Sequence, residues 1–174
     1  MPWTLTGNIR GPQGPKGDRG DPGAAGGVTR KRTTSNVVTG LTTYTGVDVL
    51  DLLVPAGVEG DFDFVARWDS AATTTGLGFK LVCQDVLKLM AVTPAFITYV
   101  ATMNDAARAP WMRGFNIPDV EMLSTAAGTT FNGLHVRGSI RGHATTDLIL
   151  ALQIRSEVSG SNVTLVAGAV STLR

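Results

Sequence analysis

The chain has 174 residues, 43% of them hydrophobic and 17% charged, with a formal net charge of +1. This length allows one domain with a substantial core beyond the first 27 residues, and the balanced charge gives no field that favours nucleic acid. The single cysteine, Cys83, excludes an intrachain disulfide framework, and no stretch reaches the ~18–20 unbroken apolar residues of a membrane span.

Glycine recurs at every third position near the N-terminus and makes five consecutive Gly-X-Y triplets, three of which contain proline. A collagen triple helix needs this period because only glycine fits where three polyproline-II chains crowd the axis. Residues 11–27 therefore predict a short collagen-like stem and a homotrimer, with a flexible Gly/Pro linker as the alternative. The register glycines are Gly11, Gly14, Gly17, Gly20, Gly23 and Gly26.

The stem is short, since five triplets span only about 45 Å. Its charged residues can pair between staggered chains, but each exposed pair contributes at most ~1 kcal/mol. Five triplets are too few to hold three chains together unaided, so we expect residues 28–174 to bring the chains together. The basic run at 30–32 is expected on a solvated face or at a trimer neck, with a phosphate or acidic partner as the alternative.

Beyond Arg32 the sequence turns to a period of two and is rich in Val, Thr, Leu and Phe, as β-strands are. We expect strands at 36–41, 47–54, 62–68 and 76–83, and Cys83 is expected to be a buried small hydrophobe. The strand at 62–68 has the clearest alternation of apolar and polar residues. One face has Phe62, Phe64, Ala66 and Trp68, and the other has Asp61, Asp63, Val65 and Arg67.

The C-terminal third repeats this pattern at 134–141, 147–155 and 163–173, with a turn at 159–162. Strands of this length separated by Gly, Ser, Thr and Asn turns predict an all-β, antiparallel sandwich of the jelly-roll kind. The domains expected are thus the stem at 11–27 and a β-sandwich head at 28–174.

Residues 84–127 break the alternation and are expected to be an irregular insertion on one face of the head. Within them, residues 96–100 are a candidate strand, and residues 86–91 or 104–109 a candidate helical turn. An aromatic and cationic cluster formed by Trp111, Arg113 and Phe115 is typical of binding hot spots, although it would equally cap one end of the sandwich.

The sequence contains no constellation that predicts catalysis. Its two histidines, His135 and His143, lack metal-type spacing, and His135 is expected to face solvent or a subunit interface. Asp61 and Asp63 could be paired carboxylates or Ca²⁺ ligands, but their alternation with apolar residues favours the solvated side of a strand. No nucleophile elbow or phosphate-binding loop is present. We therefore expect no enzyme activity, no metal and no cofactor.

Residues 7–17, Gly-Asn-Ile-Arg-Gly-Pro-Gln-Gly-Pro-Lys-Gly, resemble the start of collagen-containing minor tail and virion proteins in phages of actinobacteria. Residues 32–41, 50–64 and 134–174 resemble the trimeric jelly-roll head often attached to such stems, related in shape to the tumour-necrosis-factor and complement globular domains. The resemblance lies in strand patterns rather than catalytic signatures, and residues 84–127 depart from it.

The resemblance implies a non-enzymatic, homotrimeric protein on the virion surface, made in the host cytoplasm, as the lack of a secretory signal also suggests. Residues 1–10 would anchor it to other virion proteins through Trp3, Leu5 and Ile9. It would be a tail fibre or tail-tip component that contacts a host glycan or protein, with Trp111, Arg113 and Phe115 as the contact surface. The alternatives are a capsid decoration or head-fibre protein and, less favoured, a glycan-active fibre enzyme, which needs a carboxylate pair. No nucleic-acid binding or membrane insertion is implied.

The glycine register gives a direct test. Replacing Gly17 by Val should abolish the collagen signal in circular dichroism, because no side chain fits the triple-helix axis, while the β signal of the head persists. Gln13→Ala, at a Y position of the same stem, is the matched control and should leave both signals intact. An unchanged collagen signal in Gly17→Val would show that the stem is a linker.

Overall fold

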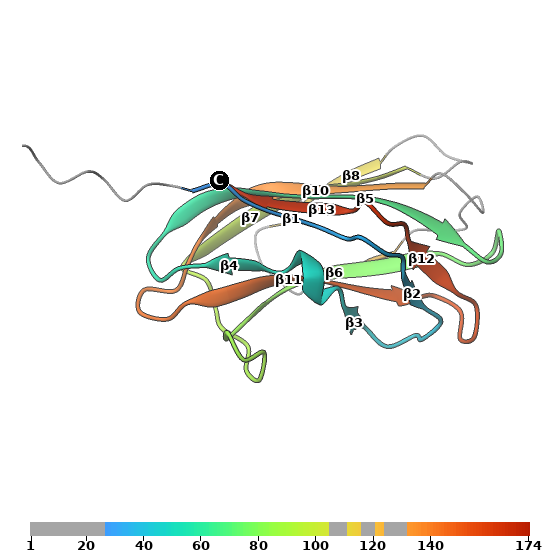
Figure 1. Ribbon diagram of the computed structural model, residues 1–174, viewed down its shortest axis with the longest axis horizontal. Coiled ribbons are helices and arrows are strands. Elements are labelled where there is room, and N and C mark those ends of the chain that lie inside the picture. Colours follow the sequence, from blue (N-terminus) through green and yellow to red (C-terminus); the bar gives the residue numbers. More distant parts are fainter. Residues whose placement is uncertain (1–26, 105–110, 116–120, 124–131) are drawn as a thin grey trace, which may run out of the picture.

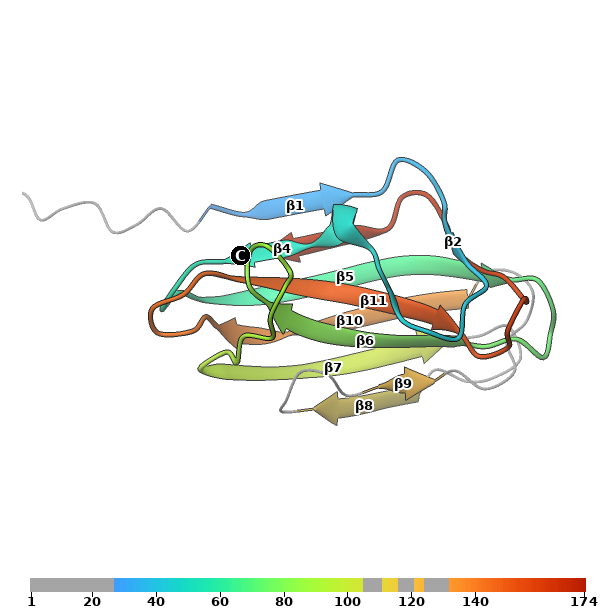
Figure 2. The same ribbon diagram turned by 90° about the horizontal axis from the view of Figure 1, so that it is seen from below.

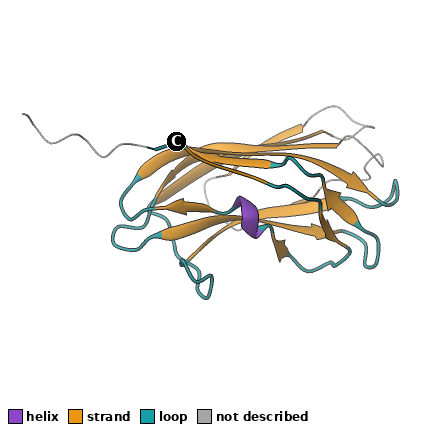
Figure 3. Ribbon diagram, viewed as in Figure 1, coloured by secondary structure: helices purple, strands orange, loops and turns teal. Residues whose placement is uncertain are grey.

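A computed structural model describes residues 27–104, 111–115, 121–123 and 132–174 of the chain. The register glycines from Gly11 to Gly26 and the expected anchor residues Trp3, Leu5 and Ile9 lie outside the described residues. The described residues form two facing layers of strands, with a single helical turn between β3 and β4 (Figure 1, Figure 3).

The strands form two sheets, in which all pairings are antiparallel. The larger one, sheet A, contains β1 (Thr29–Arg32), β2 (Val37–Thr39), β5 (Glu59–Ser70), β7 (Phe96–Asn104), β8 (Trp111–Phe115), β10 (Asn132–Arg141), β12 (Val163–Leu165) and β13 (Val170–Leu173). Sheet B contains β3 (Thr45–Gly46), β4 (Leu52–Val54), β6 (Leu77–Gln84), β9 (Met122–Leu123) and β11 (Leu148–Ser156). The helical turn η1 spans Asp48–Leu50.

The chain crosses from one sheet to the other between most consecutive strands. It passes from β4 in sheet B to β5 in sheet A, back to β6, and again to β7 (Figure 1). The same exchange recurs from β9 through β10 and β11 to β12. The main strand orders are therefore non-sequential, β1-β13-β5-β10-β7-β8 in sheet A and β3-β11-β6-β9 in sheet B. This confirms an all-β antiparallel sandwich and is consistent with a jelly roll.

The core lies between the two sheets and is built from alternate residues of the long strands. Phe62, Phe64, Ala66 and Trp68 of β5 are buried, as the alternation predicts, while Val65 between them is 48% exposed. From the facing sheet, Leu148, Leu150, Leu152 and Ile154 of β11 are fully buried. Each such side chain contributes about 1.5–3 kcal/mol by leaving water. Cys83 of β6 is also buried in this core, as expected.

Two of the expected strands are interrupted. The segment 47–54 is not one strand, because η1 replaces its middle: the Leu50 amide donates to the Val47 carbonyl at 2.8 Å, which lets Val47, Leu50 and Leu52 all reach the core. The segment 163–173 is divided into β12 and β13 by a turn at Gly168. The φ of Gly168 is +98°, a conformation that side-chain-bearing residues rarely adopt.

The segment 84–127 is also different from the expectation of an irregular insertion. Its described part contains β7 and β8 in sheet A and β9 in sheet B, so these strands belong to the sandwich itself. The candidate strand at 96–100 is confirmed and extends to Asn104. Residues 86–91 form a turn rather than a helix. In the other candidate helical turn, at 104–109, Asn104 is the last residue of β7, and residues 105–109 lie outside the described residues.

The basic run at 30–32 is part of β1, a strand that the alternation did not reveal. It pairs with β13 from Thr29 opposite Leu173 to Arg32 opposite Val170, at one edge of sheet A. Arg30 and Arg32 are exposed. Charged side chains on an edge strand are a common means of preventing edge-to-edge aggregation.

Gly138, in the middle of β10, allows a close approach between β10 and β7. A Cβ atom there would lie 2.6 Å from the Tyr99 Cβ, closer than packed carbon atoms allow. We expect Gly138→Val to lower the free energy of unfolding by about 2–3 kcal/mol, measured by urea denaturation. Arg137→Val introduces the same residue at the exposed neighbouring position. It should change the free energy of unfolding by no more than about 0.5 kcal/mol. Equal stabilities of the two variants would contradict this packing.

Candidate functional site

The outward face of sheet A has a polar hollow centred on Gly138. Side chains of β5 and β10 that alternate with core residues point to this face and surround a depression of about 400 Å³. The hollow is lined by Asp61, Asp63, Thr98, Val100, Arg137, Ser139 and Arg174.

The carboxylates of the polar hollow already have partners within the chain. The Ser139 hydroxyl donates to Asp61 Oδ1 at 2.6 Å, and His135 Nε2 lies 3.2 Å from Asp63 Oδ1. Arg174 forms an ion pair with the other oxygen of Asp63. These contacts hold the outward side chains of β5, β10 and the C-terminal residue in one network.

This arrangement does not bring Ser139 and His135 together. Ser139 and His135 lie on the same face of β10 but four residues apart, which separates them by about 13 Å along the strand. Asp61 is exposed, and Asp63 is paired with Arg174. The polar hollow can bind a polar group by hydrogen bonds.

A second candidate is the loop between β6 and β7, whose residues 86–90 we call the tip loop. The Asp85 carboxylate caps it by accepting hydrogen bonds from the Leu89 and Met90 amides at 2.6 and 3.1 Å. The Asp85 amide also donates to the Met90 carbonyl at 2.9 Å. Although the loop is fixed by its own backbone, Leu87, Leu89 and Met90 are 70%, 76% and 67% exposed. Such a concentration of exposed apolar side chains is typical of a contact surface.

The only charged residue of the tip loop, Lys88, turns back towards the sandwich. Its backbone has φ +59°, and its ammonium group lies 2.7 Å from Asp48 Oδ1 and pairs with Asp51. The Asp51 side chain is only 5% exposed. Burial raises the pKa of the Asp51 carboxyl, and Lys88 opposes that rise. The tip loop is thus held to η1 by an ion pair, and the side chains left at the tip are apolar.

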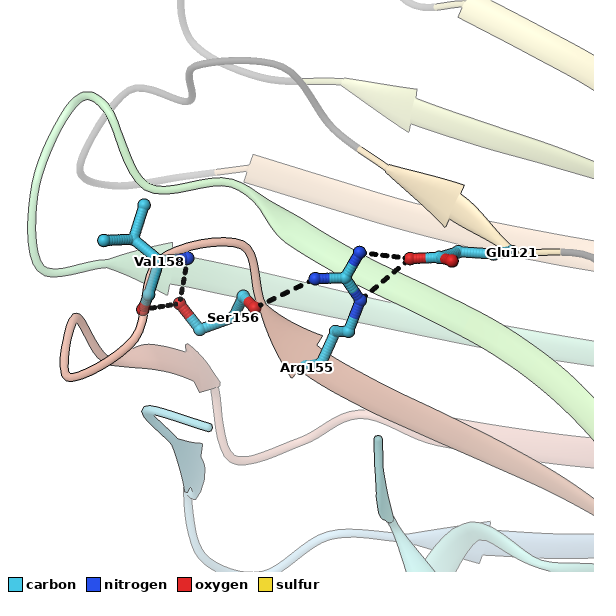
Figure 4. A network of polar contacts seen from close by, with 4 residues as sticks. All are labelled: Glu121, Arg155, Ser156 and Val158. Carbon is cyan, nitrogen blue, oxygen red and sulfur yellow. Dashed lines mark hydrogen bonds and ion pairs between the residues drawn. The ribbon is translucent and has the colours of Figure 1, made fainter. Parts of the chain in front are cut away.

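A third candidate lies on the outward face of sheet B, away from the tip loop. The Lys80 ammonium and the Arg155 guanidinium lie 5.0 and 5.4 Å from the centre of the Tyr44 ring, within the range of cation–π attraction. Arg155 Nε donates to Glu121 Oε1 at 2.8 Å, which ties β11 to the residue before β9 (Figure 4). Burial and the neighbouring Glu121 raise the pKa of the Tyr44 hydroxyl, so the ring stays neutral.

The strand end beside this cluster is fixed by buried hydroxyl groups. The Ser156 hydroxyl is positioned to donate to the Val158 carbonyl at 2.8 Å (Figure 4). It also lies within donating distance of the Ser161 carbonyl, at 2.6 Å. It also accepts from the Val158 amide at 3.2 Å. Ser156 is fully buried, so these contacts satisfy polar groups that water does not reach.

The expected contact residues Trp111, Arg113 and Phe115 are all in β8. Their backbones pair with Met103, Ala101 and Tyr99 of β7, and the geometry of their side chains lies outside the described residues. Sequence reasoning missed the tip loop, although four large apolar residues between two strands, without a period of two, were a signal for it. It also missed the polar hollow and the Tyr44 cluster, which combine residues far apart in the chain.

Comparison with known proteins adds no relative. No protein-family model matches the chain, and no curated protein matches its sequence significantly. Within the described ranges, no group of three or more His, Cys, Asp and Glu side chains could hold a metal ion. In the same part of the chain, no helix has the length and apolar character needed to cross a bilayer.

The ion pair beneath the tip loop gives a pH-dependent prediction. Lys88→Met removes the cation that opposes burial, so the folded-state pKa of Asp51 rises further above its unfolded value. At pH 7 we expect a loss of about 1–2 kcal/mol in the free energy of unfolding, because a buried carboxylate is left without its cation. Since protonation relieves that cost, the loss should shrink as pH falls towards about 4.

Urea denaturation at several pH values measures this difference. Arg141→Met is the matched control, because it breaks the exposed Arg141–Glu59 pair, whose side chains are 55% and 53% exposed. That variant should lose at most about 0.5 kcal/mol at pH 7. A loss in Lys88→Met that grows as the solution is acidified would contradict the assignment.

Proposed function

We propose that the protein is a non-enzymatic structural protein of a phage virion, a homotrimeric surface appendage with a collagen-like stem and a jelly-roll head. The observation that carries the proposal is the unbroken Gly-X-Y register that ends at Gly26, directly before an all-β sandwich whose first strand starts at Thr29. A period of three with glycine requires three chains, and a compact sandwich is a suitable unit to assemble them. The virion surface is the proposed location.

The proposed task is contact with the host surface, in a tail fibre or tail-tip component. β1, which follows the stem, and β8, which contains Trp111, Arg113 and Phe115, stand at the two ends of the main strand order of sheet A. Trp111 pairs with Met103, which lies near the C-terminal end of β7, whereas Phe96 begins this strand at its other end. This position supports β8 as a contact strand for a host glycan or protein. Residues 1–10, with Trp3, Leu5 and Ile9, would attach the protein to other virion proteins.

Two findings support a role in contact rather than in catalysis. The carboxylates of the polar hollow are engaged by Ser139, His135 and Arg174, and Ser139 and His135 are too far apart to act together. Among the described residues, the most exposed large apolar side chains lie instead in the tip loop, whose outward side chains have no catalytic group. Capsid decoration remains the alternative location of the protein. It predicts that altered protein weakens the heads of the particles and leaves adsorption unchanged.

The test is to produce phage particles with Trp111→Ala and Arg113→Ala together and to measure adsorption to host cells. We expect adsorption to fall by about tenfold or more with intact particles, because truncating aromatic and Arg anchors removes most of the energy of a contact. Val65→Ala, on the outward face of β5, is the control and should adsorb normally. Normal adsorption of the double variant with heat-fragile heads would favour capsid decoration. Degradation of a host glycan by the purified protein would contradict the non-enzymatic proposal.

A further inference from the structure

The triplet register restricts how three heads meet. A triple helix brings three chains side by side at Gly26, and β1 starts three residues later, so the three heads start next to one another. Around a three-fold axis the contact is heterologous, meaning that one surface of a copy meets a different surface of the next copy. Two complementary surfaces should therefore lie near the stem-proximal end of the head.

The outward face of sheet A is poorly suited to either surface. Charged side chains are concentrated on it, among them Asp61, Asp63 and Arg137. Ion pairs within the chain join Arg67 to Asp69 and Arg174 to Asp63. Covering this face with a second copy would remove these groups from water without giving them new partners, which costs free energy. An apolar contact, in contrast, gains free energy in proportion to the area removed from water.

An apolar groove opens beside the point where the stem joins the head. It has a volume of about 580 Å³ and is lined mostly by apolar atoms. Gly27, directly after the last triplet glycine, is part of its wall, together with Leu53, Pro55 and Val58, and the groove is also lined by the charged residues Glu59 and Arg174. Leu53 and Val58 are 44% and 47% exposed although both are large apolar residues. We call this depression the stem-end groove.

The tip loop is an apolar projection at the same end of the molecule (Figure 1, Figure 2). Leu53 of β4 pairs with Ile149 of β11, which pairs with Gln84, the residue that precedes Asp85 and the tip loop. The groove and the loop are therefore joined by one row of residues across sheet B. The Asp85 cap and the Lys88–Asp51 pair fix the loop before any partner binds, which lowers the entropic cost of binding.

We propose that the tip loop of one copy packs into the stem-end groove of the next copy, and that three such contacts close the ring of heads. This inference rests on the homotrimer of the proposed function and names the surfaces that hold it. The groove has room for more than one of the tip's side chains, and both surfaces are apolar. Because a ring uses each surface once per copy, a change in either one should affect all three contacts.

The test uses the full chain and measures its mass by light scattering at micromolar concentration. The unaltered protein should have three times the 18.2 kDa of one chain. Leu89→Glu in the tip loop and Val58→Glu in the groove should each reduce the mass to that of one chain, because a carboxylate would be buried in an apolar contact. Both residues are exposed within one head, so circular dichroism should show an unchanged fold. Val65→Glu, on sheet A, is the matched control and should remain trimeric.

A charge-swap variant tests whether the two surfaces meet. Leu89→Lys combined with Val58→Glu should restore the trimer, whereas Leu89→Lys with Val58→Lys should not. Monomers in both double variants would overturn the pairing of loop and groove. Trimers in all single variants would overturn the inference and leave the homotrimer standing, while a monomeric unaltered protein would overturn the homotrimer itself.

Discussion

Strand β5 determines how buried and exposed residues alternate in the head, because every other one of its twelve residues must face sheet B. It pairs with β10 along one edge and with β12 and β13 along the other, so its inward side chains form the floor of the core. The same alternation sends Asp61, Asp63 and Arg67 outwards. One strand thus determines both where water is excluded and where the chain presents charge.

The long strands could be predicted because their pattern is local, whereas the interruptions depend on distant residues. The alternation at 62–68 and 147–155 agrees with β5 and β11, since each has one face against the core. The helical turn at Asp48–Leu50 could not be found in this way, because the Asp51 side chain that follows it is fixed by Lys88, 37 residues away in the chain. Similarly, β1 is recognisable only from its pairing with β13.

The candidate sites were less predictable than the fold, and for the same reason. The polar hollow joins Asp63 to Arg174, and the cluster around Tyr44 joins Lys80, Glu121 and Arg155. No local motif records such contacts. The tip loop differs, because its composition alone is unusual, but the inward turn of Lys88 is what makes its surface apolar. Trp111, Arg113 and Phe115 are recognisable from composition, and the pairing of β7 with β8 gives their backbones a position at the end of the main strand order.

The pairing of β1 with β13 has a mechanical consequence. The two strands are antiparallel, with Thr29 opposite Leu173 and Arg32 opposite Val170, and the ladder continues through the Thr33 amide to the Ala169 carbonyl at 2.9 Å. A tensile load that reaches Thr29 along the axis of β1 loads these hydrogen bonds in shear, so that they share the force instead of opening one after another. Through β13 the load passes to β5, in the middle of the sheet. The head is therefore built to transmit a pull from its first strand to the longest strand of sheet A.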